Sequence, residues 1–122
     1  MEIKEELENI LQTLIDKKGV LASSLIRKDG LFLVFLSNEE TINKEISIPL
    51  ASVFNIFEQT AEEIETGSLN YLLIKSQNKN IYFVEISKDI ILVLFLDLTI
   101  EINEIYKDTV KITPKLMNIL GI

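Results

Sequence analysis

The chain of 122 residues contains neither cysteine nor histidine. Without cysteine there is no disulfide framework, no thiolate nucleophile and no cysteine-ligated zinc. Without histidine the chain lacks the side chain that titrates naturally near neutral pH and serves most often as a general acid or base. These two absences exclude most routes to catalysis. The sequence therefore predicts a binding surface rather than an enzyme.

Basic charge is also scarce, because 12 lysine and arginine residues stand against 19 acidic residues and the net charge is −7. An acidic chain repels the phosphates of nucleic acids unless its lysines cluster. The lysines of the predicted turns are scattered along the chain: Lys17, Lys18, Lys75, Lys79 and Lys88. We therefore expect no nucleic acid partner.

Long apolar runs are missing as well. The longest, Ile90 to Leu96, is far shorter than the ~20 residues of a membrane-spanning helix. The acidic stretch from Met1 to Glu8 does not resemble a secretory signal. The length fits one domain over residues 1–122, and an apolar content of 48% is sufficient for a core. We expect a cytoplasmic protein without membrane insertion.

Apolar residues at helical spacing predict three helices. The first has its stripe between Ile3 and Ile15, with Gly19 as its C-cap. The third runs from about Ile100 to Leu120 and contains Pro114, where we expect a break or kink.

The second helix is predicted from about Ser47 to Glu65. Ser47 is its candidate N-cap, Pro49 fits the first turn, and Gly67 is expected to end it. Its buried stripe is predicted to comprise Leu50, Val53, Phe54, Phe57, Ala61 and Ile64.

Five strands are predicted between the helices. Val20 to Arg27 and Leu31 to Leu36 flank the turn Lys28-Asp29-Gly30, in which glycine supplies a positive φ. After a polar loop and the second helix come Leu69 to Lys75, Ile81 to Ile86 and Ile90 to Leu96. Seven consecutive apolar residues in the last of these indicate a central strand that is covered on both faces.

These elements predict an α+β fold with the order αββαβββα and a five-stranded antiparallel sheet, because short hairpins impose antiparallel pairing. The first and third helices are expected on one face and the second helix on the other. A helix is about 10 Å wide and strands are about 4.8 Å apart, so one helix covers roughly two strands. The face of the second helix should therefore retain exposed apolar surface, which usually indicates a partner.

The order and spacing of four short motifs resemble the roadblock family, the dynein light-chain type domain. The motifs are Lys18-Gly19-Val20, Asp29-Gly30-Leu31, Gly67, and Lys88-Asp89 leading into Ile90 to Asp97. The resemblance covers nearly the whole chain and implies the same five-stranded sheet. Two features depart from it: Pro114 in the last helix, and an unusually apolar strand from Leu31 to Leu36.

The resemblance implies a homodimer, or a heterodimer with a sister subunit, in which the edge strand after the second helix pairs with its mate. The two second helices would then lie side by side. It also implies binding of a small Ras-like GTPase, or a scaffold role in a larger assembly.

Residues on two elements are candidates for this dimer interface. Ile56 lies off the main stripe of the second helix, with Ser52, Gln59 and Glu63 near it, and this set would form a helix seam. Leu69, Tyr71 and Leu73 lie on the predicted edge strand, and tyrosine is enriched in interface cores.

No catalytic, cofactor or metal site is predicted. Arg27 would be an arginine finger in a GTPase regulator, but its place beside a tight turn favours a solvated side chain. The glutamate runs at residues 39–40 and 62–65 fit a solvated surface better than a catalytic pair. Isolated glycines do not form a phosphate loop. A second hypothesis, a small-molecule sensor, would depend on Ser23, Ser24 and Glu85 as its core polar groups.

Overall fold

A computed structural model describes residues 2–122, and Met1 of the predicted N-terminal stretch lies outside these residues. The observed order αββαβββα is the predicted one, with a short 3-10 helix before the second α-helix. The elements are α1 (Ile3–Ile15), β1 (Val20–Arg27), β2 (Phe32–Ser37), η1 (Lys44–Ile46), α2 (Ser47–Glu63), β3 (Leu72–Lys75), β4 (Asn80–Ser87), β5 (Ile90–Leu96) and α3 (Ile102–Leu120).

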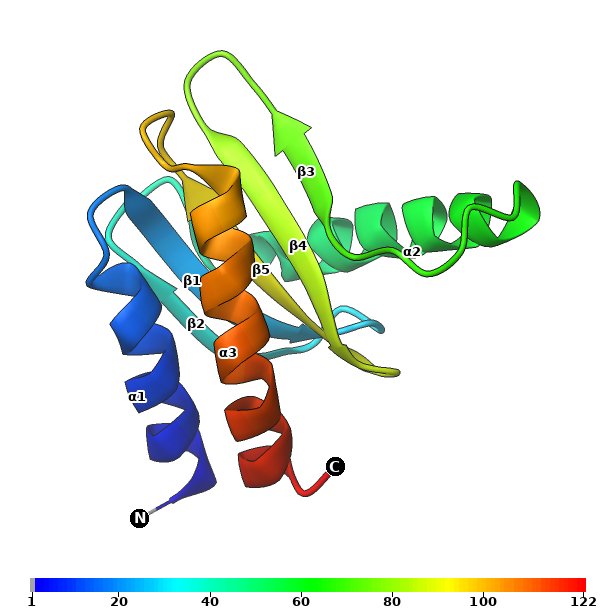
Figure 1. Cartoon of the computed structure of the whole chain (residues 1–122). Helices are drawn as coiled ribbons and strands as arrows, with labels where there is room; N and C mark the ends of the chain where they lie inside the picture. The colour runs from blue at the N-terminus through cyan, green and yellow to red at the C-terminus, as the bar shows by residue number, and fades with distance from the viewer. Residues whose placement is uncertain (1) are drawn as a thin grey trace.

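The five strands form one antiparallel sheet in the order β2-β1-β5-β4-β3. The central strand is β5, as its apolar run predicted, and six of its seven residues are buried. Figure 1 shows α1 and α3 side by side on one face of the sheet and α2 on the other. The predicted fold class and layer arrangement are therefore confirmed.

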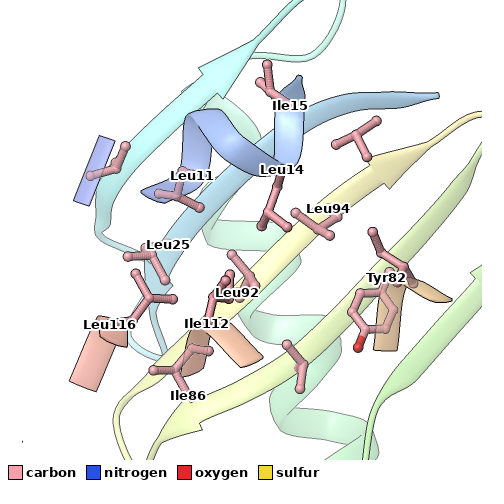
Figure 2. Close-up of a cluster of buried hydrophobic side chains, with 14 of the residues drawn as sticks. Leu11, Leu14, Ile15, Leu25, Tyr82, Ile86, Leu92, Leu94, Ile112 and Leu116 are labelled. Atoms are coloured by element: carbon pink, nitrogen blue, oxygen red, sulfur yellow. The ribbon is translucent and has the colours of Figure 1, made fainter. Parts of the chain in front are cut away.

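The larger core lies between the sheet and the α1 and α3 layer. Figure 2 shows Leu14 of α1 beside Leu94 of β5, and Leu11 of α1 and Leu116 of α3 on either side of Leu25 of β1. All five side chains are at most 4% exposed. The buried stripes of α1 and α3 follow the predicted helical spacing, because each helix has one face on the sheet.

A second core lies between the sheet and α2. Phe54 of α2 packs against Phe83 of β4, with ring centroids 6.2 Å apart, and Ala22 of β1 belongs to the same cluster. The Ser24 hydroxyl on β1 donates to the carbonyl of Val93 at 3.1 Å, which satisfies a buried polar group. Small side chains on β1 thus allow α2 to lie close to the sheet.

Three predicted helix boundaries are wrong. The C-cap of α1 is Asp16, and Gly19 lies beyond it with φ +98, where an added Cβ would be 2.8 Å from Asp97 Oδ1. Ser47 is inside α2, because η1 leads directly into the helix and the Ser47 hydroxyl donates to the Lys44 carbonyl. α2 ends at Glu63, before Gly67, because Glu65 already turns the chain with φ +56.

The break expected at Pro114 is also wrong, because α3 continues through this residue. Proline removes the hydrogen bond to the carbonyl four residues earlier, that of Val110. Both residues lie on the exposed side of α3, where water can reach that carbonyl. The Thr113 hydroxyl donates to the Thr109 carbonyl at 2.7 Å and adds a local bond at the same turn. Over residues 2–122, none of the helices has the length and apolar character that crossing a bilayer requires.

Candidate functional site

The edge strand β3 has an unpaired side, and the neighbouring half of α2 leaves apolar side chains exposed. Within residues 2–122, β3 pairs only with β4, so one side of its backbone has no strand partner. The strand has four residues and begins at Leu72, three residues later than predicted. An unpaired strand edge exposes backbone donors and acceptors to any strand that approaches it.

The C-terminal half of α2 carries exposed apolar side chains beside this edge. Figure 1 shows this half of the helix extending past β3, beyond the sheet. Ile56, Phe57 and Ile64 are 62%, 47% and 66% exposed. Phe57 and Ile64 were predicted to be buried, but that part of α2 has no sheet beneath it to cover them. The predicted asymmetry between the two faces is thus present at this end of α2, and Ile48, at the start of the helix, is also 67% exposed.

The seven candidate interface residues separate into two sets. Ser52, Ile56, Gln59 and Glu63 are all exposed and lie along one side of α2, as their spacing predicted. Leu69 precedes β3 and packs against the core cluster on the α2 face, so its assignment to the strand is wrong.

Tyr71 also precedes β3, and together with Leu73 it belongs to the opposite face. The Tyr71 ring lies 5.5 Å from that of Tyr82 and 5.4 Å from that of Tyr106, measured between centroids. Tyr71 is therefore a half-buried member of an aromatic cluster against α3.

A charged cluster around Lys28 fixes α2 on the sheet. Lys28 Nζ donates to Glu58 Oε1 of α2 and to Glu85 Oε1 of β4, both at 3.0 Å. Asn55 Nδ2 donates to the Lys28 carbonyl at 2.8 Å, and Nζ lies 5.4 Å from the centroid of the Phe54 ring. Burial by itself would lower the pKa of Lys28, but the hydrogen bonds to the two carboxylates outweigh it and raise this pKa.

Sequence reasoning missed this cluster, because Lys28 was interpreted only as a turn residue. The available signal was the spacing of Asn55 and Glu58, which places both on one side of a helix. Their common partner comes from a hairpin about thirty residues away in sequence, and no local pattern indicates such a contact.

A pocket of about 810 Å³ lies between the second half of α2 and the ends of the strands. Its charged walls comprise Lys28, Glu58, Glu62, Glu65, Glu85 and Lys88. Of the three polar groups considered for a sensor, only Glu85 lines it. Ser24 bonds to the backbone, and the buried Ser23 hydroxyl has no partner. The three groups do not converge on one cavity.

The Arg27 side chain is exposed at the end of β1 and pairs with Asp29 in the adjacent turn. Its charge is therefore neutralised locally and solvated. Residues 2–122 contain no cluster of three or more carboxylates, histidines or cysteines placed to hold a metal ion.

Comparisons with solved structures identify the same fold in several proteins. Myxococcus xanthus MglB has a TM-score of 0.87 and 13% sequence identity, with 99% of this chain and 92% of that chain covered. The gliding protein MglB from Thermus thermophilus has a TM-score of 0.82 and 15% identity, with 98% and 91% covered. A Roadblock/LC7 domain from Streptomyces avermitilis has a TM-score of 0.83 and 7% identity, with 93% and 96% covered. At these identities the likeness shows the fold alone.

No curated protein matches the chain in sequence. The sequence pattern that defines the Roadblock/LC7 domain matches residues 6–95, from α1 to β5. This range includes all three hairpin turns, α2 and the edge strand described above. The chain belongs to the Roadblock/LC7 domain family.

Proposed function

We propose that this chain is a non-catalytic regulatory or scaffold protein that dimerises through β3 and α2 and binds a small Ras-like GTPase. The observation that carries the proposal is the unpaired edge of β3 beside the exposed apolar side chains of α2. Both features are explained by one interface, in which a second β3 extends the sheet and a second α2 lies beside the first. The mate is another copy of this chain or a sister subunit of the same family.

Strand pairing at β3 would satisfy its outward backbone groups with those of the mate. The strand contains no proline, and Lys75 at its end is the only charged residue among its four. The open edge of β3 therefore has few residues that would prevent a second strand from pairing with it. The resulting sheet would be continuous across the dimer, with five strands from each copy.

Helix pairing at α2 would bury the side chains that a single copy exposes. Complete burial of an isoleucine or phenylalanine side chain contributes about 1.5–3 kcal/mol. Ile56, Phe57 and Ile64 are each about half exposed or more, so their burial would be a substantial driving force. Ser52, Gln59 and Glu63 would form the polar part of the seam, as interfaces commonly have a polar rim.

GTPase binding is supported by the family resemblance and by the exclusion of catalytic groups. Arg27 is paired with Asp29 and does not reach outward as an unpaired cation. Any regulation would therefore act by shape and charge complementarity, holding a switch loop of the GTPase. The net charge of −7 would favour association with a GTPase that has basic patches.

Light scattering tests the dimer. We expect the wild type to have about twice the 13.9 kDa mass of one chain, and Ile56→Glu to be monomeric, because a charge is then placed in the seam. Leu98→Glu is the matched control, since Leu98 is 56% exposed in the loop before α3. A monomeric wild type, or a variant Ile56→Glu that remains dimeric, would contradict the homodimer. Tyr71 is unsuited to this test, because its substitution would also disturb the aromatic cluster.

A pull-down tests the partner. Ras-like GTPases from the same genome would be loaded with GDP or with a non-hydrolysable GTP analogue and passed over the immobilised protein. We expect one nucleotide state to be retained preferentially by the wild type and to be lost with Ile56→Glu. If none of these GTPases is retained in either state, the GTPase assignment is wrong, whatever the oligomeric state.

A further inference from the structure

The two sides of α2 differ in charge. On one side, Asn55, Glu58 and Glu62 face the turn that contains Lys28. Asn55 Nδ2 donates to the Lys28 carbonyl at 2.8 Å, and Lys28 Nζ donates to Glu58 Oε1 at 3.0 Å. Glu62 lines the same pocket as Lys28 and Glu58. We call this side of the helix the Lys28 side.

The opposite side of α2 carries no charge. It consists of Val53, Phe57, Thr60 and Ile64, which are three or four residues apart and therefore share one side of the helix. Val53 packs against the core cluster beneath α2, whereas the other three are exposed. The Thr60 hydroxyl donates to the Ile56 carbonyl at 2.8 Å, so it needs no partner from outside. We call these four residues the uncharged row.

The direction of β3 determines which side of α2 would face a mate. The Phe54 ring packs on that of Phe83, which pairs with the first residue of β3. From this level β3 continues to Lys75, whereas Glu85, the partner of Lys28, lies further along β4 in the other direction. A two-fold axis through the middle of an antiparallel β3 pair therefore displaces the mate's α2 away from the Lys28 side and toward the uncharged row.

The strand spacing gives the distance between the two helices. The middle of β3 is about one and a half residues beyond its start, or about 5 Å at 3.3 Å per residue. The two-fold axis doubles this offset, so the helix axes would be about 10 Å apart. Packed helices are typically about 8–10 Å apart. Strand pairing and helix packing are therefore compatible in one dimer.

The same spacing locates the two-fold axis along α2. Figure 1 shows α2 crossing the strands and extending past β3, and its links to β4 lie at Phe54 and Glu58. One and a half strand spacings separate β4 from the axis, which is about 7 Å. At 1.5 Å per residue, α2 advances by about five residues over this distance, so the axis lies near Thr60. In an antiparallel pair, Phe57 of each copy would then lie against Ile64 of its mate.

We propose that the mate in the β3 and α2 seam is a second copy of this chain, with Phe57 of each copy against Ile64 of the other and Thr60 at the two-fold axis. This inference rests on the proposed dimer and deepens it, because it selects a second copy over a sister subunit.

The position of the glutamates favours a second copy. Glu58 and Glu62 lie on the Lys28 side, so two chains with a net charge of −7 would not bring these carboxylates together in the seam. Partner choice between different subunits commonly depends on complementary charges. The uncharged row offers no charge for such a choice, whereas two identical rows cover each other's apolar side chains. Ile56 and Glu63 border the row on the solvent side and form the rim of the seam.

Disulfide cross-linking tests this arrangement, because the chain has no cysteine of its own. A disulfide requires Cα atoms within about 7 Å of each other. Thr60→Cys should therefore cross-link two copies under oxidising conditions. Phe57→Cys and Ile64→Cys should each cross-link poorly alone, because the two copies of either residue are about 10 Å apart along the helices. An equimolar mixture of these two variants should give the mixed disulfide, which mass spectrometry identifies.

Glu62→Cys is the matched control, because Glu62 is exposed and close to the axis along α2 but lies on the Lys28 side. This variant should not cross-link. A second measurement avoids introduced thiols. Phe57→Ala should weaken the dimer at least about tenfold in sedimentation equilibrium, whereas Glu62→Ala should leave the dimer affinity nearly unchanged.

Three results would overturn the inference. The first is a dimeric wild type in which Glu62→Cys cross-links and Thr60→Cys does not, which would place the mate on the Lys28 side. The second is a dimer that neither forms the mixed disulfide nor is weakened by Phe57→Ala. Both results would leave dimerisation itself intact. The third is a monomeric wild type without any cross-link, which would contradict the homodimer and leave only a sister subunit as the mate.

Discussion

At the scale of single residues, Lys28 connects three elements that are distant in the sequence. Its side chain bonds to α2 and β4, while its own backbone lies in the turn after β1. Removing one partner of a partly buried charge cluster leaves the remaining charges without compensation. The position of α2, and with it the exposed apolar surface, therefore depends on this lysine.

Lys28→Met should lower the free energy of unfolding by about 1–3 kcal/mol, because Glu58 and Glu85 lose their cation in a partly buried place. The Lys28 pKa is raised in the folded state, so its stabilising effect is complete below the ordinary value of 10.5 and is lost as the pH rises through the folded value. Urea unfolding near neutral pH measures the effect. Lys4→Met, which removes an exposed pair with Glu8, should change stability by less than about 0.5 kcal/mol, and an equal loss in both variants would contradict the clustered role.

Tyr82 gives a second residue-scale prediction. Burial raises the pKa of its phenol from 10.0 to about 12, and its hydroxyl lies 2.7 Å from Thr109 Oγ1. Between these two pH values the unfolded chain releases the proton and the folded chain retains it, so stability falls as the pH rises.

In Tyr82→Phe this contribution is absent. Its free energy of unfolding should fall less steeply between pH 10 and about 12 than that of the wild type. At neutral pH it should lose only about 1 kcal/mol, from the hydrogen bond to Thr109. Urea unfolding at several pH values provides the comparison, and parallel curves for the two proteins would show that Tyr82 is accessible in the native state.

At the scale of elements, periodicity predicted every helix and strand except η1, but it did not place all of their ends. β5 was predicted with its observed bounds, because seven apolar residues between two turns leave no alternative. The ends of α1 and α2 were misplaced, because glycine was taken as the stop signal. Both helices end before the glycine that was expected to stop them, and the chain turns away at Asp16 after α1 and at Glu65 after α2. Gly19 is required because an added Cβ would lie too close to Asp97, a contact that depends on tertiary packing.

Pro114 was overestimated as a helix breaker. Since α3 already continues through it, Pro114→Ala should restore one backbone hydrogen bond and raise the free energy of unfolding by about 1 kcal/mol. Pro49→Ala is the matched control, because Pro49 lies in the first turn of α2, where the missing donor has no helical acceptor. The control should be neutral or slightly destabilising. The urea concentration at the midpoint of unfolding is measured for both variants and for the wild type. A loss of stability in Pro114→Ala would mean that the rigid proline ring stabilises α3 at this position.

At the scale of the whole molecule, the sequence predicted that one face of the sheet would be covered incompletely, and this is the origin of the candidate site. The argument depended only on the width of a helix and the number of strands. The prediction did not locate the uncovered region, because Phe57 and Ile64 fit the apolar stripe of α2. Their exposure depends on where the sheet ends beneath the helix, which is a property of the assembled fold.

The strand order has a consequence for the kinetics of folding. β1 and β2 form one local hairpin, and β3, β4 and β5 form a local meander. Within the sheet of residues 2–122, the two are joined only by the pairing of β1 with β5, whose nearest partners, Arg27 and Ile90, are about sixty residues apart. Closing that loop is the costly step, so docking of the two units should limit the folding rate. Leu92→Ala on β5 should slow refolding, whereas Phe57→Ala on α2 should mainly accelerate unfolding, as stopped-flow chevron plots would show.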